Sequence, residues 1–528
     1  MALLSRRVVI GTIFGVLTVV TTNSTAEPQA YASITDLGAL VPGGFSDASA
    51  VNDAGLVVGL ANPDPSSNVF HATVWTDGVP RDLGTLCSAP CPFDAHSSAS
   101  DVNELGQVVG NSEIADGYNR GFIWHEGEGM RILPPLEGDV ASVAFGINNR
   151  GEAVGNSRRS MSGGDARPVM WTADGTPHEL AGWTSGSALD VNDNEQIVGF
   201  FVADDGWGHA SQWERGILTD LGGLPAACPG PTSFAYGINR FGHVAGVADM
   251  DCSSAPHAVK WVHRVIHDLG TVKPGMSYAA SYDNINDAGD VVGYSPHPTT
   301  CPPTYGASRA TLWKHGAIID LGSLSDSPCA SSTASAVNNH GLVVGNSATA
   351  TGQSHAVVYR LNDDLARGAF GGIPRPIPGR IEAEDYDVGG QGVGYFDTTT
   401  GNEQGAFVYR ADDVDIKPSR EGGHAVGWFA AGEWLVYTVN VKRDGLYSLH
   451  ARVGSALPGR TFHVEVDGRD VTGPIPVPQL REWDRYRTVR VEGVSLHKGT
   501  QVLRVVMGPE DFMDLQWIAL VGGNSVLN

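Results

Sequence analysis

The sequence has few charged residues and no excess of basic ones. Only 17% of its 528 residues are Asp, Glu, Lys or Arg, and the formal net charge is −24. A protein that binds nucleic acid needs a basic face, so this charge balance excludes a nucleic-acid partner. A large negative charge is instead typical of a protein that must stay soluble outside the cell.

The chain also lacks long apolar runs, with one exception near its start. Arg6 and Arg7 precede an apolar run over residues 8–20, and the small residues Ser24-Thr25-Ala26 follow. This pattern predicts a signal peptide over residues 1–26, with cleavage after Ala26 or, alternatively, after Ala32. An uncleaved anchor is the other interpretation of this run. We therefore expect a secreted protein, extracellular or periplasmic, with no membrane span after signal cleavage.

No segment shows sustained helical periodicity of its apolar residues. Glycine is abundant, at 68 of 528 residues, and the apolar runs are short. These features predict an all-β protein. The length is too great for one hydrophobic core, so two or more domains are expected.

Three short patterns recur seven times in a fixed order. The first, Asn-x-x-Gly-x-x-x-Gly, has a decayed fourth copy with Glu195 in place of the first glycine. Its copies begin at Asn52, Asn103, Asn148, Asn192, Asn239, Asn286 and Asn338. The second is a short strand that ends in an aromatic residue, at Trp75, Trp124, Trp171, Trp213, Trp261, Trp313 and Tyr359. The third is Asp-Leu-Gly, which begins at Asp36, Asp82, Asp220, Asp268 and Asp320 and is degenerate at 132–134 and 179–181.

A period near 45 residues with four short strands per unit predicts a seven-bladed β-propeller over residues 33–360. We expect the Asn and the first Gly of each turn to supply positive φ for a tight hairpin. The last unit ends at Tyr359 without a fourth strand, whereas Asp36 precedes the first Asn turn. The N-terminal strand is therefore expected to complete the last blade and remove the free edges. An open β-solenoid is the alternative.

The repeats resemble the HAF-type extracellular repeats of bacteria. The resemblance rests on Asp-Leu-Gly-Thr-Leu at 82–86 and on the His-Ala-x-x-Trp strands. It implies an extracellular protein and says nothing about activity, because a propeller fold does not decide function.

The longer connections of each repeat are expected to share one face, where function usually sits. Candidate residues in these loops are Asp94, His96, Tyr118, Arg158, Arg159, Asp204, Asp205, Trp207 and His297. No short motif fixes their geometry, so the sequence identifies no catalytic residue. The recurring His residues at 71, 209, 257 and 355 are replaced by Arg120 and Arg309 in two copies, and this exchange favours a structural role.

Cysteine is scarce, and the six cysteines all lie in the loops of the repeats. An even number in an exported protein predicts disulfides. The expected pairs are Cys87 with Cys91, Cys228 with Cys252, and Cys301 with Cys329, although free or differently paired thiols stay possible. A Cys-x-x-x-Cys spacing without neighbouring His residues does not favour a zinc site.

A Pro- and Gly-rich linker is predicted over residues 361–380, and alternating strands follow it. Stretches such as 434–439, 447–453 and 462–466, the last followed by Asp467-Gly468, predict a two-sheet β-sandwich over residues 381–522. The fold class is therefore a seven-bladed propeller followed by a jelly-roll sandwich.

This last segment closely resembles a family 6 carbohydrate-binding module. The resemblance rests on ordered motifs at 381–386, 409–410, 414–416, 426–428, 432–437, 466–468 and 514–518. It implies a cleft in which Tyr409 and Trp483 form two aromatic walls and Asp514 lies on the floor, where the family usually has Asn. An ionised Asp accepts hydrogen bonds but cannot donate one.

The resemblance also implies a structural Ca²⁺. Glu382 and Glu384 are expected to point to the same side of the first strand, where both carboxylates reach one ion. Gln516 matches a third ligand position, and Arg410 is expected to supply a backbone carbonyl.

The sequence thus predicts a secreted, monomeric protein that binds polysaccharide or oligosaccharide through its C-terminal module, with the propeller as a binding or display platform. The alternative is a polysaccharide-degrading enzyme, a glycoside hydrolase or lyase, with its site on the long-loop face. A surface protein that binds other proteins is a third interpretation.

Overall fold

The computed structural model describes residues 32–87, 91, 94–160, 166–225, 232–249, 256–271, 284–296, 308–314, 317–362, 367–399, 401–402, 409–410 and 412–524. In these ranges the protein is all-β, as predicted, and its two helices are single 3₁₀ turns, η1 (Phe370–Gly372) and η2 (Ala383–Asp385). Neither of these helices is long and apolar enough to cross a membrane.

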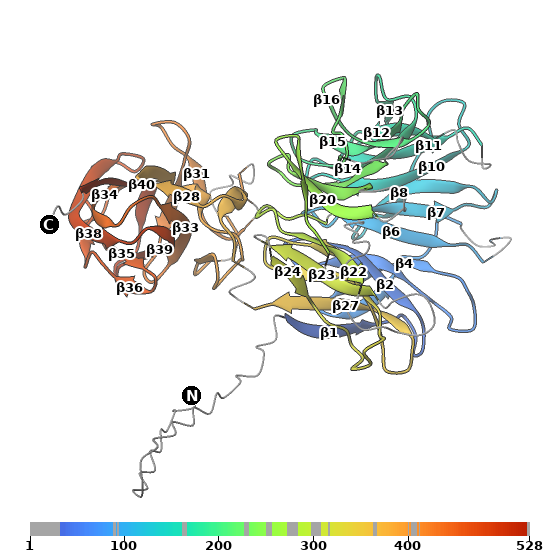
Figure 1. Ribbon diagram of the computed structural model, residues 1–528, viewed down its shortest axis with the longest axis horizontal. Helices are drawn as coiled ribbons and strands as arrows, with labels where there is room; N and C mark the ends of the chain where they lie inside the picture. The colour runs from blue at the N-terminus through green and yellow to red at the C-terminus, as the bar shows by residue number, and fades with distance from the viewer. Residues whose placement is uncertain are drawn as a thin grey trace, which may run out of the picture. The chain divides into compact units, whose positions relative to one another are not determined.

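The repeat region forms a series of small antiparallel sheets (Figure 1). The first sheet contains β2 (Ser46–Val51), β3 (Val57–Ala61), β4 (His71–Thr76) and β5 (Val79–Asp82). The second contains β6 (Ser97–Val102), β7 (Val108–Glu113), β8 (Asn119–His125) and β9 (Gly129–Leu133). The third contains β10 (Ala141–Ile147), β11 (Ala153–Arg158), β12 (Ala166–Trp171) and β13 (Pro177–Glu179). The fourth contains β14 (Gly186–Val191), β15 (Ile197–Val202), β16 (Gly208–Glu214) and β17 (Ile217–Asp220).

Three further sheets follow along the chain. The fifth contains β18 (Ser233–Ile238), β19 (Val244–Asp249), β20 (Pro256–Val262) and β21 (Val265–Asp268). The sixth has three strands in the described residues, β22 (Val291–Pro296), β23 (Ser308–Lys314) and β24 (Ala317–Asp320). The last contains β25 (Ser332–Val337), β26 (Leu342–Ala348), β27 (Ser354–Leu361) and, from the start of the chain, β1 (Ala32–Gly38).

The pairing of β1 with β27 confirms the prediction that the N-terminal strand completes the last sheet. The two strands run antiparallel, with Ala32 opposite Leu361 and Gly38 opposite Ala356. Strands from the two ends of the repeat region therefore share one sheet (Figure 1). The seven-bladed arrangement itself stays a prediction.

The Asn turn is built differently from the expectation. The first glycine alone adopts positive φ, as at Gly55 (φ 81°), and Glu195 adopts it in the decayed copy (φ 59°). The second glycine is required by close packing, because a Cβ on Gly59 would lie 2.0 Å from the carbonyl oxygen of Asp47. The Asn does not have positive φ, so that part of the expectation is wrong.

The Asn side chains instead connect successive repeats. In Asn239, Oδ1 accepts hydrogen bonds from the backbone N–H groups of Phe241 and His243, and Nδ2 donates to the carbonyl of Asn286 at 2.9 Å. The same Nδ2-to-carbonyl bond joins Asn52 to Asn103, Asn103 to Asn148, Asn148 to Asn192, Asn192 to Asn239 and Asn286 to Asn338. Asn338 donates to the carbonyl of Asn52 at 2.9 Å, so the seven bonds form a closed cycle.

The recurring His residues have a structural partner in each copy. Nδ1 of His71 lies 2.8 Å from Asp82, and the pairs His209–Asp220, His257–Asp268 and His355–Asp36 repeat this contact at 2.9–3.1 Å. Each Asp begins an Asp-Leu-Gly copy. The pairs therefore join the third and fourth strands of a sheet, in agreement with a structural role for this His.

The structure contains a disulfide between Cys87 and Cys91, as predicted. Cys329 is also disulfide-bonded. Cys228, Cys252 and Cys301 lie outside the described residues, so the other two predicted pairs stay predictions.

The C-terminal region contains two sheets. One has the order β28 (Arg375–Ile377), β33 (Trp434–Val441), β39 (Gly499–Met507), β35 (Thr461–Val466), β36 (Arg469–Asp470), with β30 (Tyr395–Phe396) and β37 (Ile475–Pro476) at its side. The other has the order β31 (Ile416–Pro418), β32 (His424–Phe429), β40 (Met513–Asn524), β34 (Gly445–Gly454), β38 (Arg487–Leu496), with β29 (Gly379–Glu382) paired to β40.

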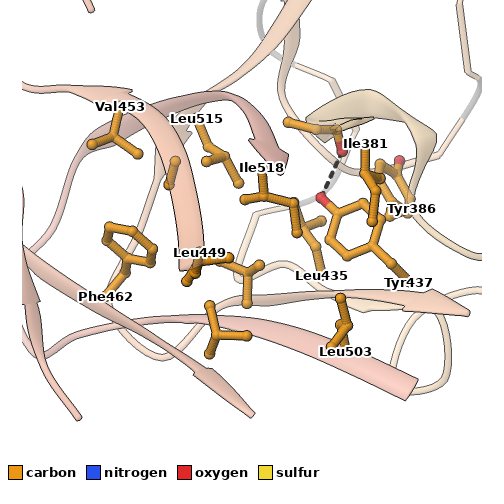
Figure 2. Close-up of a cluster of buried hydrophobic side chains, with 14 of the residues drawn as sticks. Ile381, Tyr386, Leu435, Tyr437, Leu449, Val453, Phe462, Leu503, Leu515 and Ile518 are labelled. Atoms are coloured by element: carbon orange, nitrogen blue, oxygen red, sulfur yellow. Dashed lines mark hydrogen bonds between the residues drawn. The ribbon is translucent and has the colours of Figure 1, made fainter. Parts of the chain in front are cut away.

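One apolar core lies in this region and draws on both sheets. Leu435 and Leu503 come from one sheet, and Leu449, Leu515 and Ile518 come from the other, all at most 1% exposed (Figure 2). Alternation along the strands directs these side chains inward, as in a β-sandwich. The strand β28 lies within the predicted linker, so part of that linker contributes to a sheet of the sandwich.

Candidate functional site

Trp483 lies in the loop between β37 and β38, at the edge of the sandwich. Its side chain is 37% exposed, and the next residue, Asp484, has positive φ (62°). Single exposed apolar side chains are common on protein surfaces, so this exposure shows only that the ring is accessible. The predicted wall residue is therefore available to a ligand.

Asp514, the predicted floor residue, lies on β40 and is only 1% exposed. Its Oδ2 is 2.8 Å from Nζ of Lys417, on β31. The same Nζ lies 2.7 Å from Oδ1 of Asp484, next to Trp483 in the sequence. The structure thus brings the Trp483 loop and Asp514 together through Lys417, and we call Lys417, Asp484 and Asp514 the ion-paired floor.

The charges of this floor depend on one another. Burial lowers the pKa of Lys417, but its bonds to Asp484 and Asp514 outweigh burial and hold that pKa above its usual value. Burial raises the pKa of Asp514, and Lys417 opposes that rise. Lys417 therefore stays cationic at neutral pH, because removing its proton would leave two carboxylates without a counter-charge.

The side chain of Lys417 packs so closely against Gly427 that a side chain at position 427 would collide with it. A Cβ on Gly427 would lie 2.9 Å from Cε of Lys417 and 3.4 Å from Oδ1 of Asp514. The following residue, Trp428, has positive φ (49°), sits where the register between β32 and β40 shifts, and is 41% exposed. A second exposed indole thus follows Gly427 directly in the sequence.

Sequence reasoning missed Lys417 and Trp428 as site residues. Trp428 was visible as part of the Val426-Gly427-Trp428 motif, and an exposed indole could have been suspected from it. Lys417 carries no local signal, because its partners lie 67 and 97 residues further along the chain.

Tyr409, the other predicted wall, is half-buried. Its ring centroid lies 4.8 Å from that of His424, on β32, and 5.8 Å from that of Phe370. Its hydroxyl donates a hydrogen bond to Asp385, and burial raises the pKa of the phenol, which stays neutral. Tyr409 contacts the His424 end of β32, and the floor lies at the Gly427 end, about 10 Å along the strand. That the rings of Tyr409 and Trp483 face each other stays a prediction.

Two of the predicted calcium ligands are buried beside one turn, Ser419–Gly423. Oε1 of Glu384 accepts a hydrogen bond from the backbone N–H of His424 at 3.2 Å, and Nε2 of Gln516 donates to Ser419 and to the carbonyl of Gly422. Oε2 of Glu384 and Oε1 of Gln516 are buried with no hydrogen-bond partner in the described chain. Burial, with smaller effects of Asp385 and Glu382, raises the pKa of Glu384 to about 7. Two unpaired buried oxygens fit a hard cation such as Ca²⁺.

The other two predicted ligands lie differently. The strand β29 ends at Glu382 and Glu384 lies in η2, so the expected alternation of the two carboxylates is not found. Glu382 is exposed and pairs with Arg380 at 2.8 Å. The side chain of Arg410 is buried over the ring of Tyr386 and pairs with Asp412. The described residues contain no group of three or more His, Cys, Asp or Glu side chains that could hold a metal ion, so amide and backbone oxygens would have to complete the shell.

A polar cavity of about 190 Å³ lies at the Asn turns of the repeats. Its carboxylates all accept backbone hydrogen bonds from another repeat, as when Asp101 accepts from Ile147 and Glu104 accepts from Asp53. The carboxylates that line it are Asp53, Asp101, Glu104, Asp190, Asp193 and Asp287. These side chains are used to join repeats.

The loop candidates of the repeat region make local pairs. Asp205 pairs with His209 at 3.2 Å, Arg159 lies 3.7 Å from Asp139, and the ring of His96 lies 6.1 Å from that of Phe70. Trp207 is exposed, and His297 lies outside the described residues. The contacts of Asp205, Arg159 and His96 are thus with residues of the same or the neighbouring repeat.

Comparison with known proteins matches residues 405–522 to the family model "Carbohydrate binding module (family 6)". Among solved structures, the chain is similar to the C-terminal family 6 module of LamC, a marine laminarinase from Zobellia galactanivorans, at 26% identity over 27% of this chain and 98% of that one (TM-score 0.21). It is also similar to a β-1,3-glucan-binding family 6 module from Bacillus halodurans, at 23% identity over 28% and 100% (TM-score 0.22). A third is a module of Cellvibrio mixtus lichenase 5A in complex with cellotriose, at 25% identity over 28% and 98% (TM-score 0.21). The family match supports a C-terminal family 6 carbohydrate-binding module in this chain, and with it carbohydrate binding through that module.

Proposed function

We propose that this protein is secreted and recognises polysaccharide through residues 381–522. The observation that carries the proposal is an exposed indole, Trp483, held beside a polar floor within the segment that matches the family. The apolar C–H face of a sugar ring stacks on such an indole, while hydroxyl groups bond to the floor.

The residues have distinct roles in this proposal. Trp483 and Tyr409 are the aromatic walls, and Asp514 accepts hydrogen bonds from sugar hydroxyls. A single shallow site of this kind binds weakly, at about micromolar to millimolar Kd.

We also propose a structural Ca²⁺ in the module. Glu384 and Gln516 would hold it with their unpaired oxygens, and its charge would compensate the buried carboxylate. Both side chains contact the turn Ser419–Gly423, which leads from β31, the strand of Lys417, into β32. The cation would therefore order one side of the binding site.

The repeats are proposed to form a seven-bladed β-propeller that serves as a binding or display platform. The pairing of β1 with β27 and the closed cycle of Asn hydrogen bonds support this arrangement. The predicted signal peptide and the resemblance to HAF-type repeats support secretion.

The experiment is incubation of the full-length protein with a panel of plant, algal and bacterial polysaccharides, with both co-sedimentation and product release measured. Binding without release of reducing ends or unsaturated products is expected. Product release that disappears when residues 33–360 are deleted would contradict the proposal and establish the enzyme interpretation.

A further inference from the structure

The ion-paired floor has an excess of acceptors beside Trp483. Asp484 and Asp514 contribute carboxyl oxygens to this floor, and Lys417 contributes its one ammonium group. Oδ1 of Asp514 is buried with no hydrogen-bond partner in the described residues. A sugar hydroxyl both donates and accepts hydrogen bonds, so two carboxylates alone would leave its acceptor side without a donor.

Lys417 is the group that can supply the missing donor. Its ammonium carries three N–H groups. The contacts with Asp484 at 2.7 Å and with Asp514 at 2.8 Å account for two of them. The side chain of Lys417 is 11% exposed and that of Asp484 is 28% exposed, so solvent reaches the floor on this side.

The geometry of Lys417 is fixed before any ligand arrives. Two carboxylates from different parts of the chain hold Nζ, and Gly427 leaves room for the stem. A held ammonium loses little rotamer freedom when it donates to a ligand. This arrangement is expected of a binding group rather than of a surface lysine.

The charge of the floor opposes an anionic ligand. One ammonium faces two carboxylates, so a third carboxylate or a sulfate would meet no free positive charge. At the rim, Arg420 and Arg485 lie 3.9 Å and 3.4 Å from the single carboxylate of Glu482, and about two thirds of each Arg side chain is exposed, so solvent screens their charges at the floor.

We propose that Lys417 is a specificity-determining residue of the glycan site, which donates a hydrogen bond to a sugar oxygen beside Asp514 and selects uncharged sugars over uronic and sulfated ones. This inference rests on the proposed function. It adds a binding residue and a ligand class to that function.

The test uses affinity electrophoresis of the full-length protein with neutral polymers (laminarin, barley β-glucan, arabinoxylan) and anionic polymers (alginate, polygalacturonate, carrageenan) at one ionic strength. The wild-type protein is expected to be retarded by at least one neutral polymer and by no anionic one. Stronger retardation by an anionic polymer overturns the inference while leaving carbohydrate binding intact. Retardation by no polymer, or retardation that Trp483→Ala leaves unchanged, overturns the proposed function as well.

Variants then test Lys417 directly. Lys417→Met is expected to weaken binding to the neutral polymer about tenfold or more, because a hydrogen bond from a charged donor is lost. Lys417→Met/Asp514→Asn is expected to regain most of the binding, since the Asn amide both donates and accepts.

The exposed Lys442→Met is the matched control and should bind as the wild type does. Folding is checked by circular dichroism, and a folded Lys417→Met protein that binds as the wild type does overturns the role of Lys417. If Lys417→Met does not fold, the preference of the wild-type protein between neutral and anionic polymers decides the inference.

Discussion

The repeat region and the C-terminal module use polar side chains in opposite ways. In the repeats, apolar residues form several small clusters, and polar side chains that recur with the period join one repeat to the next. In the module, a single large cluster fills the sandwich, and the polar groups of the floor occur once. The recurring Asn, His and Asp residues hold the repeats together, whereas we propose that Trp483 and its polar neighbours bind a ligand.

This difference gives a way to distinguish residues that build the fold of a repeat protein from residues that bind its ligand. A polar residue that returns at every period and finds the same partner each time serves assembly. A polar or aromatic residue without periodic copies, left exposed beside a charged group, is the better candidate for recognition.

The first prediction removes β1, the strand that pairs with β27 and joins the two ends of the repeat region. Deletion of residues 32–38 removes β1 and exposes the edge of β27, so the repeat region is expected to lose about 5 kcal/mol or more, the full stability of a typical domain. Thermal unfolding followed by circular dichroism should show loss of the cooperative transition of the repeats. A transition like that of the wild-type protein would contradict the closing role of β1.

The second prediction removes one joint between repeats. Asn239→Ala leaves the N–H groups of Phe241 and His243 without a partner and removes one of the two hydrogen bonds to the carbonyl of Asn286, and should cost about 4 kcal/mol. The control is Asn194→Ala, whose exposed side chain makes one bond to the carbonyl of Arg240. Chemical denaturation of both variants measures the loss of unfolding free energy. Equal losses would contradict the role of the Asn cycle in holding the repeats together.

The third prediction concerns the module alone. Ca²⁺ at a hundredfold excess over its Kd should stabilise the module by about 2.7 kcal/mol, and a chelator should remove that gain. Glu384→Gln should abolish the response to Ca²⁺, whereas Glu382→Gln, at an exposed carboxylate, should weaken it less. An unfolding temperature that changes with neither Ca²⁺ nor a chelator would contradict the calcium proposal.

The fourth prediction is a pH dependence of the repeats. Burial, together with Asp53 and Asp193, raises the pKa of Glu104 from 4.5 to about 8. A carboxyl with a higher pKa in the folded state binds its proton more tightly there, so the free energy of unfolding should fall as pH rises from about 4.5 to about 8. Glu104→Gln should flatten this slope in denaturation curves measured across that range. If the slope of unfolding free energy against pH is unchanged in this variant, other carboxyl groups cause the pH dependence and the role of Glu104 is contradicted.

Much of the fold was predictable because it repeats. Seven copies of one pattern predicted the strands and turns, and the displaced copy at Asp36 predicted the pairing of β1 with β27. The role of the Asn was not predictable, because its Nδ2 bonds a carbonyl in the next repeat, 44–52 residues away. The candidate site was half predictable: the family resemblance indicated Trp483 and Asp514, while Lys417 contacts Asp484 and Asp514 only across the fold.

The central claim is that recognition belongs to the module and not to the repeats, and two exposed indoles test it most directly. Trp483 lies in the module and Trp207 lies in a repeat loop, at 37% and 47% exposure. The measurement is the Kd of the Trp483→Ala and Trp207→Ala proteins for the polysaccharide that the wild-type protein binds. Trp483→Ala is expected to weaken binding about tenfold or more while Trp207→Ala leaves it unchanged. Loss of binding in Trp207→Ala with Trp483→Ala unaffected would contradict the account.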